Sequence, residues 1–451
     1  MNRHIKNIEK QVLKKITPSP RERKELEQVI NQLKKEVTKE IEKNRLPISI
    51  ELVGSTAKET YLKDSLDIDL FLLFSTNVSR KQLQKTGLSI GRSILKNQEE
   101  CFAEHPYIRG TYKGVKTEIV PCYKIESASQ KLSAVDRTPL HTKYVKDHLL
   151  ESQKNEVRLL KQFLKGIGCY GAEAEVEGFS GYLCEILILK YCSFQNLIHN
   201  VKNWSYGTKL SLDQAKIPRF DDPLVFIDPV DHERNVSSAL SAEKFNLFVK
   251  ACQEYIKQPS LTFFFPHKIK PWPMDRIKKE IENKEFMAVK IEKPSIIPEN
   301  LFPQIRKATK SIRELCEQYD FAILDSRFHI DDAIYIVLQP EKRTISQTML
   351  HMGPPIKLEK NAEEFAHRWT GDPRLIRKPF ERNKRLYVEI KREYTDIKTL
   401  LEEQVNNLSL GKHIDKMAQK NVSILEKNHL LTENLRLFWT EYLDKKMPWE
   451  R

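Results

Sequence analysis

The chain has 451 residues, of which 40% are hydrophobic and 31% are charged, proportions typical of a globular protein with roughly two to four domains. Lysine and arginine number 76 against 62 aspartates and glutamates, a net charge of +14, which favours a polyanionic partner, nucleic acid before an anionic membrane surface. The seven cysteines are never spaced as CxxC, which argues against disulfides and a cysteine zinc site and favours buried thiols in a reducing compartment.

No apolar run in the sequence is long enough to cross a bilayer. The longest candidate, residues 179–198, is interrupted by Glu185 and Lys190. The first residues of the chain also lack the apolar stretch of a signal peptide. We therefore expect a cytoplasmic location and no membrane partner.

The first 150 residues are predicted to form a mixed α/β domain. Ser19 and Glu22 make a capping box, and they begin a helix with an apolar stripe from Leu26 to Ile41. Hydrophobic patterns further along predict a strand, a helix and a strand, over residues 48–53, 79–97 and 115–121. Pro121 is expected to close the last of these strands, because proline cannot donate a hydrogen bond to a sheet.

Gly54 and Ser55 follow the first strand and are expected to turn it into a short helix. The backbone N–H groups at such a turn, with a helix N-terminus behind them, can bind phosphate oxygens. The apolar run over residues 67–74 then predicts a buried strand that contains Asp67 and Asp69. Residues two apart on a strand share a face, so these two carboxylates should project together.

Two carboxylates side by side in a core strand repel each other and are costly to remove from water. A divalent cation would remove that cost, and Mg²⁺ prefers carboxylates together with the phosphate oxygens of a substrate. The alternative is a strand end where Asp67 and Asp69 face water or pair with lysines. The phosphate-binding turn just upstream favours the first interpretation, which is metal-dependent nucleotidyl transfer.

Helices are predicted to dominate the next segment, residues 151–268. One helical pattern covers residues 155–165 and ends at glycines, and two others are capped by Ser180 and Ser241. The helix after Ser180 is apolar on nearly all sides, so it must be buried. Prolines within residues 270–273 then mark a domain boundary.

Beyond residue 269 the predicted order is strand, helix, strand, strand, helix, strand. The segments are 286–291, 301–318, 321–330, 333–339, 362–369 and 386–390. This βαββαβ order is that of a ferredoxin-like fold, and helical patterns over 394–409 and 411–427 follow it. The sequence thus predicts a multidomain α+β protein with domains 1–150, 151–268 and 269–451.

Several short motifs occur in a fixed order along the chain. They are Gly54-Ser55, Asp67-x-Asp69, Glu118 to Tyr123, Arg137 to His141, Asn155 to Lys161, Tyr170 to Glu173, Gly178 to Glu185, Asp228 to Asp231, Arg234 to Val236 and His351 to Pro355. In this order they resemble the archaeal-type (class I) CCA-adding tRNA nucleotidyltransferases, of the polymerase-β-type nucleotidyltransferase superfamily. The resemblance covers nearly the whole chain. It implies a catalytic nucleotidyltransferase head, a helical central domain and a C-terminal tRNA-binding body and tail.

The same resemblance implies roles for individual residues. Asp67, Asp69 and Glu118 would be the catalytic residues and would hold two Mg²⁺ ions that clamp the attacking and departing oxygens. The nucleotide-binding set would be Gly54, Ser55, Lys58, His141, Lys161, Tyr170 and Arg234. Within this set Ser55 and Lys58 would hold phosphates, and Arg234 would contact the base of the incoming nucleotide. Taken alone, each of these side chains also has a purely structural explanation, such as a helix cap for Ser55.

The sequence departs from the family pattern at two positions. The third carboxylate is usually aspartate, and Glu118 is one methylene longer, which could loosen a metal site that tolerates little distortion. Lys58 stands where many relatives have arginine, so a bidentate phosphate contact would become a point charge. Both departures could slow the reaction without abolishing it.

The implied enzyme adds C, C and A to tRNA from CTP and ATP without a nucleic-acid template. Its partners would be the 3′ end and acceptor arm of tRNA, and a homodimer is left open. One alternative is another template-independent polymerase, a poly(A) or uridylyl transferase, because the same head serves all of them. The other is an RNA-binding protein with a decayed head, against which the intact Asp67, Asp69 and Glu118 argue.

Overall fold

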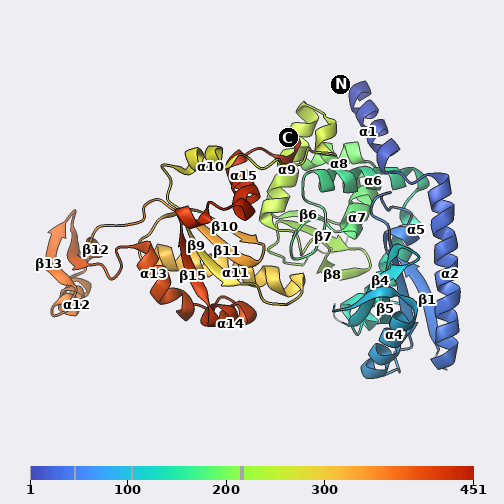
Figure 1. Ribbon diagram of the computed structural model, residues 1–451, viewed down its shortest axis with the longest axis horizontal. Coiled ribbons are helices and arrows are strands. Elements are labelled where there is room, and N and C mark those ends of the chain that lie inside the picture. Colours follow the sequence, from blue (N-terminus) through green and yellow to red (C-terminus); the bar gives the residue numbers. More distant parts are fainter. Residues whose placement is uncertain (1, 45–46, 103–104, 214–217) are drawn as a thin grey trace. The chain divides into compact units, whose positions relative to one another are not determined.

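The structure is a computed structural model that describes residues 2–44, 47–102, 105–213 and 218–451. The chain forms two compact units, whose elements are labelled in Figure 1. The first unit contains the residues up to Lys268 together with Lys446–Arg451, and the second contains Ile269–Lys445. Within the described ranges, no helix is long and apolar enough to cross a membrane.

A five-stranded sheet forms the head of the first unit, in the order β1-β2-β5-β4-β3. Its strands are β1 (Ile48–Val53), β2 (Asp67–Phe74), β3 (Lys96–Phe102), β4 (Pro106–Tyr112) and β5 (Val115–Tyr123). β2 and β5 run parallel, and the other neighbours are antiparallel. The predicted mixed sheet is confirmed, and the short helix α3 (Gly54–Ala57) directly follows β1 as expected.

The two faces of this sheet differ in chemistry. Helices α2 (Pro20–Asn44) and α4 (Arg80–Ile94) cover one face, on which Ile68, Leu70 and Leu72 are buried, and α2 runs along β1 in Figure 1. The other face carries the alternate residues of β2, beginning with Asp67 and Asp69. The period of two in a strand therefore separates the apolar core from the carboxylates.

Two predictions for the head were wrong in detail. The strand expected to end at Pro121 continues to Tyr123. Pairing of β5 with β4 reaches only as far as Ile119, so Pro121 lies where β5 has one partner strand and a missing N–H is tolerated. The helix expected over residues 79–97 ends at Ile94, because residues 96–102 pair with β4 as the edge strand β3.

Helices form most of the remainder of the first unit. They are α1 (Asn2–Ile16), α5 (Thr138–His148), α6 (Glu151–Gly166), α7 (Gly181–Tyr191), α8 (Phe194–Val201) and α9 (Ala242–Lys257). Ser180 and Ser241 cap α7 and α9 as predicted. The end of the chain returns to this unit, where the ring of Trp449 stacks on that of Phe263 with centroids 5.1 Å apart.

The segment predicted to be helical also contains a small sheet, which the sequence interpretation missed. It consists of β6 (Thr208–Leu210), β7 (Leu224–Asp228) and β8 (Asp231–Asn235). Strands of three to five residues are too short to display a clear period of two. The sheet bears on function because β7 ends at Asp228 and β8 carries Arg234.

The second unit contains a four-stranded antiparallel sheet in the order β10-β11-β9-β15. Its elements are β9 (Met287–Glu292), α11 (Pro298–Gln318), β10 (Ile323–Ile330), β11 (Ala333–Pro340), α13 (Ile397–Gln404), α14 (Lys412–Lys420) and β15 (Val422–Glu426). This is the βαββαβ order of the ferredoxin-like fold, so that prediction is confirmed. Helices α10 (Met274–Ile281) and α15 (Arg436–Asp444) form a second core with the sheet, around Phe286 and Trp439.

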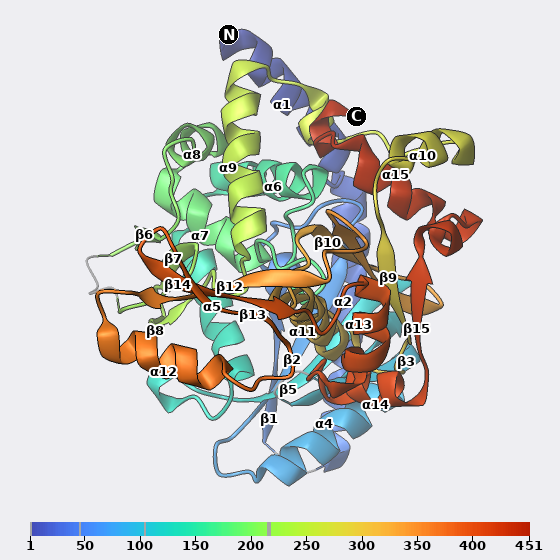
Figure 2. The ribbon, with the colours of Figure 1, turned by 90° about the vertical axis from the view of Figure 1, so that its left-hand side faces the viewer.

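The elements assigned to the second half of this fold were wrong. The helix and strand predicted at 362–369 and 386–390 belong to a separate module, drawn in orange in Figure 2. The module comprises β12 (Thr348–Pro355), α12 (Glu359–Trp369), β13 (Leu375–Arg382) and β14 (Arg385–Lys391). The true fourth strand is β15, within a stretch predicted to be helical, because pairing with β9 overrides the local pattern there.

Candidate active site

Asp67, Asp69 and Glu118 lie on one face of the head sheet. Asp69 on β2 is directly opposite Glu118 on the parallel strand β5, and Asp67 is opposite Lys116. The carboxylate of Asp67 is 3.9 Å from the Lys116 ammonium, so this aspartate has a loose lysine contact of the kind considered as the alternative. Parallel register thus brings Glu118, which is far away in the sequence, beside the two aspartates of β2.

The carboxyl group of Asp69 is buried beside the other two carboxylates. Burial, followed by the negative charges of Glu118 and Asp67, raises the pKa of Asp69 to about 7. Its Oδ2 atom lies so close to Gly54 that a Cβ there would be 2.0 Å away. Gly54 also has a φ of +72°, which side chains disfavour. Glycine therefore allows the turn at Gly54, with Ser55 next in α3, to lie directly against Asp69.

Glu118 pairs with an arginine that the sequence interpretation did not identify. Arg109, directly opposite Glu118 on β4, places its Nε 2.7 Å from Glu118 Oε1. Arg109 also donates to the Tyr107 hydroxyl at 3.0 Å and lies 3.4 Å from Glu99 on β3. The guanidinium therefore holds Glu118 at one end of a charged row that crosses three strands of the sheet, β5, β4 and β3.

The carboxylates suit a divalent cation chemically. Among the residues that the structure describes, no three His, Cys, Asp or Glu side chains already converge tightly enough to hold a metal ion. Carboxylate oxygens are nevertheless the preferred ligands of Mg²⁺, and a cation would offset the burial and the repulsion that together raise the pKa of Asp69. The three carboxylates can therefore serve as metal ligands if Glu118 releases Arg109 and binds the metal ion instead.

Lys58 and Lys161 share one buried carboxylate, that of Glu185 on α7. Lys58 Nζ lies 2.5 Å from Glu185 Oε2, and Lys161 Nζ lies 3.5 Å from Glu185 Oε1. Thr60 donates its hydroxyl to Glu185 at 2.6 Å. Although burial alone would raise the pKa of Glu185, the two ammonium groups lower it below its usual value. The network joins α3 and the loop after it to the helices of the central segment.

Replacing Glu185 with alanine should lower the free energy of unfolding by roughly 3–5 kcal/mol, because two ammonium groups would stay buried without their shared carboxylate. Urea titration measures this loss. Glu25→Ala is the matched control, since Glu25 forms an exposed ion pair with Arg21 on α2 and such pairs contribute little. Equal losses in the two variants would contradict the importance of the buried network.

Tyr170 and Lys161 both approach the first turn of α7. A Cβ placed on Gly181 would be 3.3 Å from the Tyr170 hydroxyl and 3.7 Å from Lys161 Nζ. Lys165, one turn after Lys161 on α6, lies 5.5 Å from the centroid of the Tyr170 ring. Burial lowers the pKa of Lys165, against the opposing charge of Asp67. Lys165 thus contacts the ring of Tyr170 and is within electrostatic reach of Asp67.

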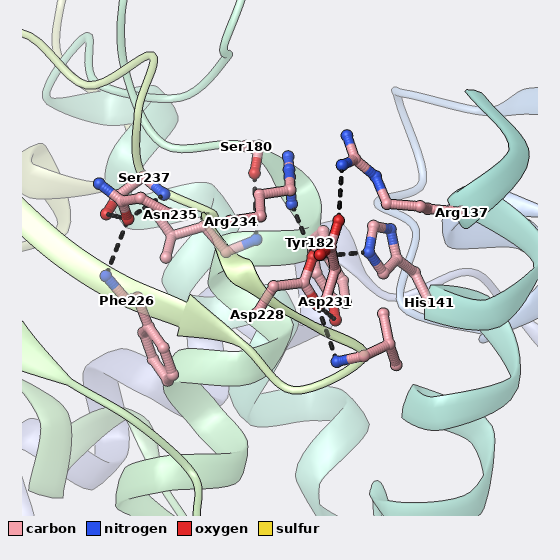
Figure 3. A network of polar contacts seen from close by, with 12 residues as sticks. Arg137, His141, Ser180, Tyr182, Phe226, Asp228, Asp231, Arg234, Asn235 and Ser237 are labelled. Carbon is pink, nitrogen blue, oxygen red and sulfur yellow. Dashed lines mark hydrogen bonds and ion pairs between the residues drawn. The ribbon is translucent and has the colours of Figure 1, made fainter. Parts of the chain in front are cut away.

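Four donors converge on Asp228 at the end of β7 (Figure 3). Oδ2 accepts from His141 Nε2 at 2.8 Å and from Arg234 Nη1 at 2.9 Å. Oδ1 accepts from the Tyr182 hydroxyl and the Val230 N–H, both at 3.1 Å. We call Asp228, His141, Tyr182 and Arg234 the Asp228 cluster.

Asp228 is charged in this cluster although it is completely buried. Burial would raise the pKa of Asp228, but the hydrogen bonds from His141 and Val230 and the charge of Arg234 lower it to about 2. Burial also lowers the pKa of His141, so the ring is neutral near pH 7. Because a carboxylate only accepts, the proton of the neutral ring must sit on Nε2.

Ring contacts connect the Asp228 cluster to Lys58, which directly follows α3. The Tyr182 and His141 rings stack with centroids 4.1 Å apart, and Lys58 Nζ lies 5.9 Å from the centroid of the Tyr182 ring. One series of contacts therefore joins four of the predicted nucleotide-binding residues, Lys58, Lys161, His141 and Arg234, through Glu185, Tyr182 and Asp228. The other three lie beside this series: Gly54 is against Asp69, the Ser55 carbonyl accepts from the Thr60 N–H at 3.0 Å, and Tyr170 approaches Gly181.

Family models match the chain in three segments. The nucleotidyltransferase domain matches residues 5–141, the second domain of tRNA nucleotidyltransferase matches 155–265, and the C-terminal domain of the CCA-adding enzyme matches 282–427. The CCA-adding enzyme of Methanosarcina barkeri is 36% identical over 92% of this chain and 92% of its own length. The chain belongs to the CCA-adding tRNA nucleotidyltransferase family.

Two other CCA-adding enzymes also match most of this tRNA nucleotidyltransferase. The CCA-adding enzyme of Methanocaldococcus jannaschii is 36% identical over 94% of this chain and 96% of its own length. That of Archaeoglobus fulgidus is 39% identical over 78% of this chain and 80% of its own length. These matches confirm the family, the enzyme class and the nucleotidyltransferase head that the motifs implied. Members of such a family use nucleotide substrates and a metal ion.

Several residues at this site were not identified as functional from the sequence. The residues are Arg109, Lys165, Tyr182, Glu185 and Asp228. Three of them, Tyr182, Glu185 and Asp228, lie inside the family motifs, which was the only signal available for them. Arg109 and Lys165 had no signal at all, because only register across the sheet and the packing of α6 bring them to the site.

Proposed function

We propose that this family member adds C, C and A to the 3′ end of tRNA from CTP and ATP, without a template and with release of pyrophosphate. The observation that carries this proposal is the extent of the match. Similarity to CCA-adding enzymes covers 92% of the chain and includes their C-terminal domain, whereas the catalytic head alone is common to many nucleotidyltransferases.

We propose that Asp67, Asp69 and Glu118 bind Mg²⁺ in a two-metal arrangement. When bound, Mg²⁺ would lower the pKa of the RNA 3′-hydroxyl and neutralise charge on the departing pyrophosphate. The turn at Gly54 and Ser55 offers backbone N–H groups to phosphate oxygens. Its contact with Asp69 supports an arrangement with the triphosphate and the carboxylates side by side.

The other proposed nucleotide contacts come from charged and aromatic side chains. Lys58 and Lys161 would attract the triphosphate, with Glu185 compensating part of their charge. Tyr170 and His141 would contact the triphosphate and sugar. Arg234 would contact the base, since a guanidinium has several N–H donors and no acceptor and this side chain is 29% exposed.

We propose the domain division 1–150, 151–268 and 269–451 for these tasks, in the cytoplasm. The first domain would carry out the transfer, the second would complete the nucleotide site, and the third would bind the acceptor arm of tRNA. A homodimer is a separate hypothesis, which sedimentation of the purified protein tests.

Affinity for tRNA should fall steeply with salt, because the +14 chain is expected to bind RNA phosphates. With about six phosphates neutralised, binding should weaken roughly a thousandfold between about 50 and 200 mM salt. Filter binding of labelled tRNA at several salt concentrations measures the slope. An affinity independent of salt would contradict binding through phosphates.

Incorporation of labelled CTP into tRNA that lacks its CCA end tests the proposed chemistry. We expect incorporation and pyrophosphate release in equal amounts with Mg²⁺, and neither in EDTA. The same tRNA without CTP tests binding alone. Binding without incorporation would favour an RNA-binding protein with a decayed head, and incorporation in EDTA would contradict the metal assignment.

A further inference from the structure

Asp228 lies beside the proposed nucleotide-binding residues but is not one of them. It contacts two of the proposed nucleotide-binding residues at once, since Oδ2 accepts from both His141 and Arg234. The side chain is completely buried, while Arg234 beyond it is 29% exposed. Asp228 thus lies between His141 and Arg234 and joins the two side chains (Figure 3).

The geometry leaves Asp228 little freedom to move. A carboxylate has about four acceptor positions, and His141, Arg234, Tyr182 and the Val230 N–H occupy four. A free arginine side chain samples many rotamers, and holding one of them costs conformational entropy. A fixed, charged acceptor reduces that cost and leaves the other N–H groups of the guanidinium for a ligand.

Contacts that do not involve Asp228 also fix the hairpin that carries Arg234. The side chain of Asn235 accepts from the Phe226 N–H at 2.9 Å and donates to Asp222 at 2.8 Å and to the Leu224 carbonyl at 3.0 Å. Loss of the Asp228 charge should therefore release the Arg234 side chain while the backbone of β8 stays in place.

We propose that Asp228 is a positioning residue for nucleotide selection, which fixes the guanidinium of Arg234 for contact with the incoming base. This inference rests on the proposed function, in which Arg234 contacts the base. Asp228 touches neither nucleotide nor metal in this account, and it acts only through the side chains that it holds.

The test compares Asp228→Asn with Asp231→Asn. Asp231 lies in the same hairpin, is also buried, and pairs with Lys131 at 2.7 Å and Arg137 at 2.8 Å instead of Arg234. The measurement is kcat/KM for CTP and UTP on tRNA ending before CCA, and for ATP and GTP on tRNA ending in CC. Asp228→Asn should lower the preference for CTP and ATP roughly tenfold or more, whereas Asp231→Asn should keep the preference.

A double variant separates positioning from a general structural effect. If Asp228 acts through Arg234, Asp228→Asn combined with Arg234→Ala should discriminate no worse than Arg234→Ala alone, because the effects of coupled residues do not add. Additive losses would overturn the inference. Circular dichroism checks folding, and if Asp228→Asn is unfolded the same ratios are measured in Asp228→Ser.

The outcomes distinguish this inference from the proposed function. If Arg234→Ala loses discrimination and Asp228→Asn keeps it, the positioning role is wrong and the proposed function stands. If Arg234→Ala itself keeps the ranking of the four nucleotides, the proposed role of Arg234 fails first, and the inference fails with it.

Discussion

Replacing Asp69 with alanine should lower the rate of CTP incorporation by about a thousandfold or more. Metal-ion stabilisation of transition-state charge contributes several kcal/mol, and each 1.36 kcal/mol corresponds to about tenfold in rate. Affinity for tRNA should change little, because RNA is expected to bind through basic surface elsewhere. Single-turnover incorporation and filter binding measure the two quantities on the same preparation.

Asp64→Ala is the matched control for this experiment. Asp64 is an exposed carboxylate three residues before Asp67, outside β2, so its loss should leave turnover nearly unchanged. Near-normal incorporation by Asp69→Ala would contradict the metal assignment. An equal loss in both variants would instead indicate general damage to the loop before β2.

Asp69 also gives stability a dependence on pH and on metal. In the unfolded chain its carboxyl releases its proton near the ordinary aspartate pKa of 3.8, whereas in the native state the pKa is about 7. The native state therefore binds more protons between these values, and through this group stability should fall as pH rises from about 4 to 7.

Adding Mg²⁺ at pH 8 should raise the melting temperature of the parent and leave that of Asp69→Asn almost unaffected.

Changing Glu118 to glutamine should lower turnover about a hundredfold or more, whereas Glu118→Asp should remain active. The amide keeps the size of the side chain but loses the charge that a metal ion requires. The shorter aspartate keeps the charge, and it is the residue expected at this position in the family. Single-turnover rates at several Mg²⁺ concentrations separate weaker metal binding from a slower chemical step.

Glu99→Gln is the control for the Glu118 series. Glu99 also contacts Arg109, but from the outer strand β3, so its loss perturbs the arginine without removing a proposed ligand. It should retain most of the activity. If Glu118→Gln turned over substrate as fast as the parent, Glu118 would not be a metal ligand. A large loss of activity in Glu99→Gln would indicate that Arg109, rather than the Glu118 carboxylate, is the important group.

The catalytic head could be predicted from sequence because its signals are local. The alternation over residues 48–53, the turn at Gly54 and the apolar run around Asp67 and Asp69 each fix the structure within a few residues. The close approach of Gly54 to Asp69 gives a physical reason for glycine there. Caps such as Ser180 and Ser241 are local signals of the same kind.

Features that depend on pairing between distant segments could not be predicted in the same way. The strand β15 is five residues long and follows an amphipathic helix, so only its pairing with β9 identifies it. Arg109 reaches Glu118 through the register of β4 against β5. The Asp228 cluster joins α5, α7, β7 and β8, and no short window of sequence contains that contact.

Sequencing the products made on trimmed tRNA tests the central claim most directly. The protein is supplied with tRNA that lacks its CCA end and with CTP alone, ATP alone, or both, and an unrelated RNA of similar length serves as the control. We predict that CTP alone adds two C residues and stops, that both nucleotides complete CCA, and that the unrelated RNA is not extended. Runs of A or U, or equal extension of the unrelated RNA, would contradict CCA addition.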